Sequence, residues 1–178
     1  TTGVKNTLIG GLAGDSLTTG SENVAIGYAA LITEDAHGKN VAIGKSALTA
    51  QNAGADAYNV AVGFEAGKAM TTGIQNTIIG GLAGDALTTG VSNTVLGYGA
   101  LSTEDTGSRA IAIGYKALLT QNYDGSSYNV AIGYEAGKVI TTGTQNTLIG
   151  GLAGDAITTG ARNTLIGYIA GTGLVQGG

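Results

Sequence analysis

The sequence predicts an all-β fold, a parallel β-solenoid (β-roll) made of ten short coils. The first observation is a motif that recurs along the whole chain and reads NVAIGYEAG in its clearest copy, at residues 129–137. The copies begin at residues 6, 23, 40, 59, 76, 93, 110, 129, 146 and 163, so that successive coils start 17 or 19 positions apart. A period this regular is typical of a repeat architecture that grows in one dimension.

The second observation is a longer period on top of the first, because like residues recur 70 positions apart, over four coils with lengths of 17, 17, 19 and 17. The similar segments TTGVKNTLIGGLAGDSLTTG, TTGIQNTIIGGLAGDALTTG and TTGTQNTLIGGLAGDAITTG begin at residues 1, 71 and 141. We therefore expect one elongated domain over residues 1–178. Because the chain begins inside a repeat, without Met or a signal peptide, we expect it to be a piece of a longer fibre protein.

The third observation is what each coil position requires, counting the first residue of a coil as position zero. Position four is Gly and position seven is Ala in all ten coils. The glycine indicates a bend with positive φ or a close backbone approach, and the alanine indicates room for a single methyl group. Helix is disfavoured, because each apolar run is short, β-branched and ended by Gly.

Position zero is Asn in nine coils and Ala110 in the seventh. Asparagine tolerates turn conformations, and its amide can donate and accept hydrogen bonds. We predict a structural turn ladder of stacked asparagines, with a local weakness at Ala110. The ladder consists of Asn6, Asn23, Asn40, Asn59, Asn76, Asn93, Asn129, Asn146 and Asn163.

Positions one to three form a triplet of Thr, Val, Ile, Leu or Ala residues in every coil. Successive side chains of a strand point to opposite faces, so both faces of this strand are apolar. Such strands are normally covered on both sides, and the coil's own interior covers only one. We therefore predict a homotrimer around a shared axis. We also expect two short strands per coil, at positions zero to four and six to ten.

Composition excludes several classes of protein. The 33 glycines follow no G-X-Y period and the chain has no Pro, which excludes collagen. An apolar content of 43% with 11% charged residues is not typical of disorder. A net charge of −4 with eight scattered basic residues argues against nucleic acid as a partner. No run of 18 apolar residues occurs, so we expect no membrane insertion.

The connectors between motifs are of three kinds. Short TTG connectors indicate tight turns, and two connectors, TEDAHGKN and TEDTGSRA, carry an acidic pair. The third kind, beginning at Thr49 and Thr120, is two residues longer and should bulge outward once per cycle. Loops tolerate variation that strands do not, so these bulges are our candidate surface-binding loops. Their candidate residues are Gln51, Asn52, Asp56, Tyr58, Gln121, Asn122, Tyr123, Asp124 and Tyr128.

The motif resembles a known family of repeats. Segments such as NVAIGYAAL, NVAIGKSAL and AIAIGYKAL are similar to the head repeats of trimeric autotransporter adhesins (YadA-like), and the NTxIG pattern with TTG connectors is similar to repeats of bacteriophage tail fibres. The resemblance implies a left-handed parallel β-roll, three chains about one axis and a role in surface attachment. It implies an extracellular location, on a cell surface or in a virion tail fibre. The coil here is longer than the usual head repeat.

No catalytic set of residues recurs, so we predict a protein that is not an enzyme, with no catalytic residues, no metal site and no cofactor. His37 lies beside Glu34 and Asp35, and we expect a solvated loop there rather than a metal or acid–base site. The pair formed by Glu104 and Asp105 is likewise expected to be exposed, with a weak cation site as the alternative.

Two further patterns bear on binding. The GGLAGDSL segments differ from the calcium-binding nonapeptide by a displaced glycine, so Asp15, Asp85 and Asp155 are expected to be turn residues. Aromatic residues at position five should stack between coils and cover the seam between subunits, with sugar binding as the alternative. They are Tyr28, Phe64, Tyr98, Tyr115, Tyr134 and Tyr168.

The sequence thus favours a structural rod or head segment of a trimeric attachment fibre that binds a cell-surface glycan or protein receptor. We favour a phage tail fibre over a bacterial adhesin, because the connectors are long and regular and no anchor is present. One alternative is a self-assembling extracellular filament, since the final coil NTLIGYIAGTGLVQGG ends without a polar cap and invites end-to-end stacking. A monomeric ice-binding or calcium-binding solenoid is a further alternative.

Overall fold

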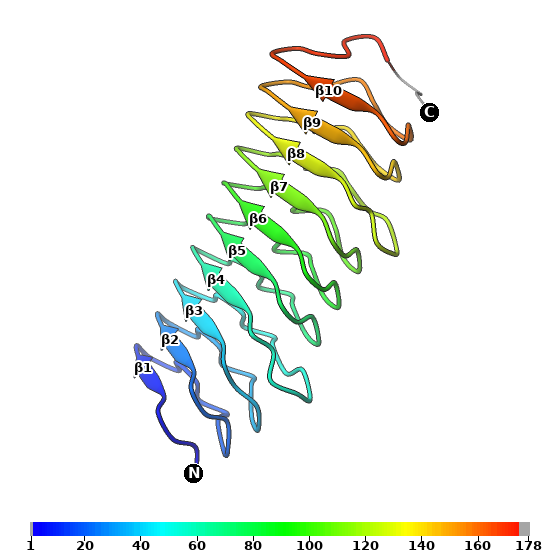
Figure 1. Cartoon of the computed structure of the whole chain (residues 1–178). Coiled ribbons are helices and arrows are strands. Elements are labelled where there is room, and N and C mark those ends of the chain that lie inside the picture. Colours follow the sequence, from blue (N-terminus) through cyan, green and yellow to red (C-terminus); the bar gives the residue numbers. More distant parts are fainter. Residues whose placement is uncertain (1, 175–178) are drawn as a thin grey trace.

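Each coil folds into one three-residue strand followed by a series of turns, as the computed structural model of the chain describes for residues 2–174. The coils stack into a rod, with the strands side by side along its length (Figure 1). The parallel β-solenoid predicted from the repeat is confirmed, since the ten strands form one parallel sheet in chain order. They are β1 (Thr7–Ile9), β2 (Val24–Ile26), β3 (Val41–Ile43), β4 (Val60–Val62), β5 (Thr77–Ile79), β6 (Thr94–Leu96), β7 (Ile111–Ile113), β8 (Val130–Ile132), β9 (Thr147–Ile149) and β10 (Thr164–Ile166).

Strand pairing places like positions of neighbouring coils directly beside each other. Val24 pairs with Val41 across β2 and β3. Val41 pairs with Val60 in the next step, although the intervening coil is one of the longer ones. The extra length of that coil is therefore absorbed by the connector, and the strand register does not change.

The glycine at position four satisfies both of the conditions expected from the sequence. Its φ lies between 128° and 144° in all ten coils, a region that L side chains rarely adopt. A Cβ on Gly27 would also lie 2.6 Å from the carbonyl carbon of Gly44 in the next coil. Glycine is therefore required both by its own backbone conformation and by the coil stacked on it.

The expected second strand at positions six to ten is absent from residues 2–174. Ala29 and Leu31, at positions six and eight of the second coil, have φ of 56° and 51°. Backbone in this left-handed region cannot extend as a strand. The turns still stack, because the Ala29 N–H donates to the Gly11 carbonyl (2.9 Å) and the Leu31 N–H to the Ala47 carbonyl (3.0 Å). The second strand was predicted wrongly because non-glycine residues with positive φ are uncommon.

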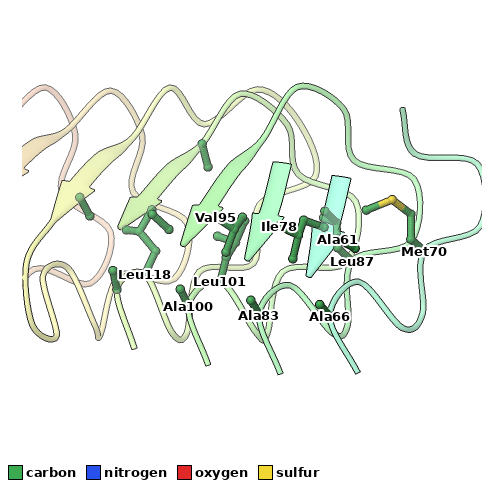
Figure 2. Packing of buried hydrophobic residues seen from close by; sticks show 14 of the residues in the cluster. Ala61, Ala66, Met70, Ile78, Ala83, Leu87, Val95, Ala100, Leu101 and Leu118 are labelled. Carbon is green, nitrogen blue, oxygen red and sulfur yellow. The ribbon is translucent and has the colours of Figure 1, made fainter. Parts of the chain in front are cut away.

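The interior is a thin column between the strands and the turns. Position two points inward, and so do the alanine at position seven and the residues at positions eight and eleven. Figure 2 shows Met70, Ile78 and Leu87 of neighbouring coils pointing into this column. Gly67 lies where a Cβ would be 3.1 Å from side-chain atoms of Ile78 and Leu48, so neighbouring coils fill the space that a small residue leaves.

We predict that Gly97→Ala destabilises the rod strongly. The added methyl group would lie 2.6 Å from the Gly114 carbonyl carbon at φ 140°, so strain and overlap should together cost about 3 kcal/mol or more. Gly54→Ala is the matched control, because Gly54 has φ 70° and a Cβ there meets nothing within 4 Å. It should cost only ~1–2 kcal/mol. Thermal unfolding followed by circular dichroism measures both, and equal losses would contradict the steric account.

Candidate functional site

The outward sheet face is formed by positions one and three of β1–β10 and runs along the rod. Its side chains are Thr, Val, Ile and Leu, and no charged residue lies on it in the described strands. Position two of the same strands is buried from β2 to β9, which places positions one and three on the side away from the interior. Ile9 and Leu96 are 57% and 44% exposed. An uncharged and largely apolar strip, with Thr at position one in five strands, is thus presented to the surroundings along the rod.

An aromatic row flanks this face at position five. The rings of Tyr98 and Tyr115 stack with centroids 5.9 Å apart, and those of Tyr115 and Tyr134 with centroids 5.4 Å apart. The stacking between coils expected from the sequence is therefore present in coils six to eight. All three rings remain exposed. Whether a neighbouring subunit covers them stays a prediction.

A polar column flanks the other side of the face, at the position before each ladder asparagine. Lys5 Nζ pairs with Glu22 Oε1 at 3.1 Å, and Arg162 Nε donates to Gln145 Oε1 at 3.1 Å. Lys39 lies 5.1 Å from the ring centroid of Tyr58. The outward sheet face is therefore bounded by charged and polar side chains on one side and by aromatic rings on the other.

The nine position-zero asparagines lie in a column and are hydrogen-bonded from coil to coil. The Asn23 backbone N–H donates to Asn6 Oδ1 at 2.9 Å, and the same contact recurs up the rod. The amide also ties the coil to itself, since Asn76 Nδ2 donates to the Gly90 carbonyl at 2.9 Å. This column is a structural element, because its members from Asn23 to Asn146 are buried.

The substitution of Asn by Ala110 removes a ladder hydrogen bond in the next coil, at Asn129, and not at Ala110 itself. Its N–H still donates to Asn93 Oδ1 at 2.9 Å. The Asn129 N–H lacks the asparagine acceptor and donates to Ser127 Oγ at 3.5 Å. Gln121 helps to close the gap, because its Oε1 accepts from Asn129 Nδ2 at 2.8 Å.

Position eleven forms an interior column in which four polar residues stand among Leu, Met and Ile. Glu34, Gln51, Glu104 and Gln121 are all fully buried. The expected exposure of the two acidic connectors is therefore wrong for Glu34 and Glu104, and the surface role expected of Gln51 and Gln121 is wrong as well. The physical reason is the column itself, since Met70 and Leu87 occupy the same position in other coils. Comparing position eleven across coils would have revealed it.

Glu104 has partners for both of its carboxylate oxygens. Oε1 accepts from the Gly107 N–H at 2.8 Å, and Oε2 accepts from Gln121 Nε2 at 3.0 Å and from the Tyr123 N–H at 3.2 Å. Together with the bond from Asn129 to Gln121, these contacts form one connected network inside the rod. Such a buried network is favourable only while every member is satisfied.

Glu34 occupies the same position in the first cycle and is only partly satisfied. Its Oε1 accepts from the His37 N–H at 3.2 Å and lies 4.0 Å from His37 Nδ1. Within residues 2–174 its Oε2 has no partner, and neither has the buried His37 Nδ1. Burial raises the pKa of Glu34 above its ordinary value, although the hydrogen bond and charge of His37 act in the opposite direction. One ligand atom each of Glu34, Asp35 and His37 lies within 4.8 Å of the others.

The remaining candidate loop residues lie at or near the surface. Asn52 is half-buried, and the others are exposed. In the first bulge, the hydrogen bond from Lys39 Nζ to Asp56 Oδ2 (2.6 Å) lowers the pKa of Asp56 and raises that of Lys39. In the second bulge, Asn122, Tyr123 and Asp124 line a hollow of about 450 Å³. The exposed loop residues are Asp56, Tyr58, Asn122, Tyr123, Asp124 and Tyr128.

Asp85 illustrates how the rod treats its turn aspartates. Its side chain is half-buried, and Oδ1 has no hydrogen-bond partner within the described chain. Burial raises the pKa of Asp85, and the nearby Glu65 carboxylate adds to the increase. The first-cycle counterpart, Asp15, is exposed.

Comparisons with protein-family models, with characterised proteins and with solved structures found no match. The resemblance to adhesin and tail-fibre repeats therefore rests on the motif residues alone. Within residues 2–174, no helix has the length and apolar character needed to cross a membrane.

We predict that Asp85→Asn stabilises the rod at pH 7 and not at low pH. A carboxyl whose pKa is raised by folding favours the folded state below its ordinary pKa, and this contribution is lost as the pH rises through the raised value. The neutral amide avoids that loss, so the melting temperature at pH 7 should rise by about 1–4 °C. The gain should vanish below about pH 4. Asp15→Asn is the control and should change little, whereas a gain independent of pH would contradict the assignment.

We predict that Gln121→Leu destabilises the rod by about 2–4 kcal/mol, because it leaves Glu104 Oε2 without its amide donor and removes an acceptor from Asn129. The double variant Glu104→Leu/Gln121→Leu removes both polar groups from the column. It should be more stable than the single variant in urea unfolding. If the double variant is less stable, the network is not the cause.

Proposed function

We propose that this chain is a non-enzymatic structural rod of a homotrimeric attachment fibre, and that the outward sheet face is its trimer interface. The supporting observation is the face itself, which is uncharged, largely apolar apart from five threonines at position one, and continuous from β1 to β10. Contiguous exposed apolar surface of more than a few hundred Å² marks an interaction site in soluble proteins. The interior of the coil is already filled, so this face needs a partner outside the chain.

The dimensions of the face favour an assembly of three rods around an axis over a face-to-face contact between two rods. Ten strands at ~4.8 Å spacing give a strip roughly 45 Å long, and three residues at ~3.3 Å give a width of about 10 Å. Its area of roughly 450 Å² is well below the ~800 Å² that each partner buries in a standard interface. A stable contact must therefore extend over the aromatic row or the polar column. Three rods around a common axis bury the strip at the centre and both flanks against neighbours.

An identical chain is the partner that fits the repeat of the face. Each side chain of one coil is stacked on its equivalent in the next, so the face has a regular ridge at every strand. A second copy has the same spacing and interlocks along the whole length. The absence of charge on the described strands removes the repulsion that identical faces would otherwise suffer.

The attachment role rests on the connectors. The two longer connectors, before β4 and β8, project further from the rod than the others do (Figure 1). They carry the exposed residues Asp56, Tyr58, Tyr123 and Tyr128. Exposed tyrosine and acidic groups on loops held by a rigid scaffold suit a glycan or protein receptor on a cell surface. An extracellular fibre, viral or bacterial, is the setting that fits this arrangement.

The alternatives receive less support. End-to-end stacking into a filament would use the open first coil, where Leu8, Ala13 and Leu17 line a hollow of about 470 Å³. That contact is confined to one coil, whereas the sheet face runs over ten strands. Ice binding needs free threonine hydroxyls, whereas Thr18 and Thr88 donate theirs to backbone carbonyls at 3.0 Å and 2.8 Å.

Light scattering on the purified chain tests the proposal, with an expected mass of about three times 17.4 kDa on an elongated particle. Ile113→Lys places a charge in the middle of the outward sheet face and should give a folded monomer, because a buried unpaired charge costs several kcal/mol. Ser92→Lys is the matched control in the exposed polar column and should remain a trimer.

A monomeric parent chain would overturn the trimer, and so would an Ile113→Lys variant that keeps the trimer mass. Binding of the fluorescently labelled trimer to bacterial and animal cells tests attachment. Binding to bacterial cells supports a phage fibre, and binding to animal cells supports an adhesin. A trimer that binds neither contradicts the receptor-binding part of the proposal.

A further inference from the structure

We propose that Glu34, Asp35 and His37 form a binding site for one divalent transition-metal ion of the Zn²⁺ type. The site lies on the connector between β2 and β3, away from the outward sheet face. It is independent of the proposed trimer and goes beyond the attachment role. It also differs from the expectation, drawn from the sequence, that the chain binds no metal.

The first argument is that two buried atoms with lone pairs lack partners at the same place. The Glu34 side chain is fully buried, and its Oε2 accepts no hydrogen bond within residues 2–174. His37 Nδ1, which lies 4.0 Å from the other carboxylate oxygen, is also buried without a partner. Unsatisfied buried polar atoms are rare in folded proteins, because each costs free energy. A cation between the two groups satisfies both.

The second argument comes from the equivalent site one cycle later. Glu104 occupies the same coil position, but Gln121 and the Tyr123 N–H complete its hydrogen bonds. The residue at the place of His37 is Gly107, so no ring nitrogen is present. The chain therefore has two copies of one connector. The buried carboxylate of the second copy has hydrogen-bond partners for both oxygens, and that of the first copy does not.

The amide that completes Glu104 is engaged elsewhere in the first cycle. Gln51 Nε2 lies 3.4 Å from the Gly73 carbonyl, and Gln51 Oε1 accepts from Asn59 Nδ2 at 3.0 Å. Asn40 stands at the ladder position that Ala110 occupies in the second cycle. With its amide turned to Gly73, Gln51 supplies no donor to Glu34. Glu34 Oε2 thus lacks a donor because Gln51 has other partners than Gln121 has in the second cycle.

The donor set selects the kind of ion. One imidazole nitrogen and two carboxylates form a mixed set that suits Zn²⁺ and similar first-row ions, whereas Mg²⁺ and Ca²⁺ prefer oxygen ligands alone. Two bonds of ~2.1 Å span at most about 4.2 Å, so ligand atoms now within 4.8 Å of one another need only small side-chain rotations. The His37 side chain is 33% exposed, which leaves a route for the ion from solvent.

Zinc titration of the chain, prepared without a polyhistidine tag, tests the site. His37 is the only histidine, so its ring ¹⁵N signals report the ligand directly in an NMR spectrum. We expect calorimetry to show one Zn²⁺ per chain, with a large shift of the Nδ1 signal and no competition from Mg²⁺ or Ca²⁺. His37→Gly, which copies the second cycle, should weaken binding by about tenfold or more while the circular dichroism spectrum is retained.

Glu104→Gln is the matched control at the second copy of the connector, and it should leave zinc affinity unchanged. Three results would overturn the proposal. The first is the absence of zinc binding, in which case a water molecule joins the two unpaired atoms. The second is binding that leaves the His37 ring signals in place, which would indicate adventitious binding to surface carboxylates. The third is equal affinity in His37→Gly and the parent chain.

Discussion

The close approach of each coil's backbone to the next is the constraint on which this structure depends. At position four the backbones of Gly27 and Gly44 leave no room for even one methyl group between them. Coils that touch so closely must have the same shape where they touch, so each coil repeats the same strand and the same left-handed positions, and nine of the ten coils begin with asparagine. The regular sequence follows from this contact, because a coil of different shape could not be stacked on its neighbours.

The same stacking turns each coil position into a column along the rod. Between the first and the last coil, a column such as position two or position eleven stays enclosed, whatever residue a given coil places in it. Most enclosed columns contain apolar residues, such as the small alanines at position seven. Position eleven is the exception, because it encloses two glutamates and two glutamines. Their hydrogen-bond requirements must be met within the column, and Glu104 and Glu34 differ in how far this is achieved.

Apart from the proposed metal site, which includes the buried Glu34, function in such a rod falls to the surfaces that the columns leave outside. The rest of the interior serves stability, and the asparagine ladder holds the corner of nine of the ten coils. The outward sheet face, the aromatic row and the longer connectors remain available. The sheet face is uncharged and largely apolar and suits self-association, whereas the connectors vary from coil to coil and suit recognition. This division between a constant face and variable loops underlies the fibre proposal, whereas the metal proposal rests on the buried Glu34 and its difference from Glu104.

Much of the fold could be derived from the sequence by itself. The interval of the motif determined the number of coils, the parallel pairing and its register, and the fixed Gly and Ala residues determined where backbone and side chains approach closely. These inferences succeed because stacking imposes the same steric demand in every coil, and that demand is visible as identity at one position.

Three features depend on how the coils pack against one another. Positions six and eight adopt left-handed turns, although residues such as Ala29 and Leu31 give no local signal for them. Glu34 and Gln121 lie inside the rod, although Glu and Gln in a connector are ordinarily exposed. Gln121 satisfies Glu104, whereas Gln51 turns away from Glu34. In each case the outcome depends on contacts between coils, which the local sequence of one coil does not contain.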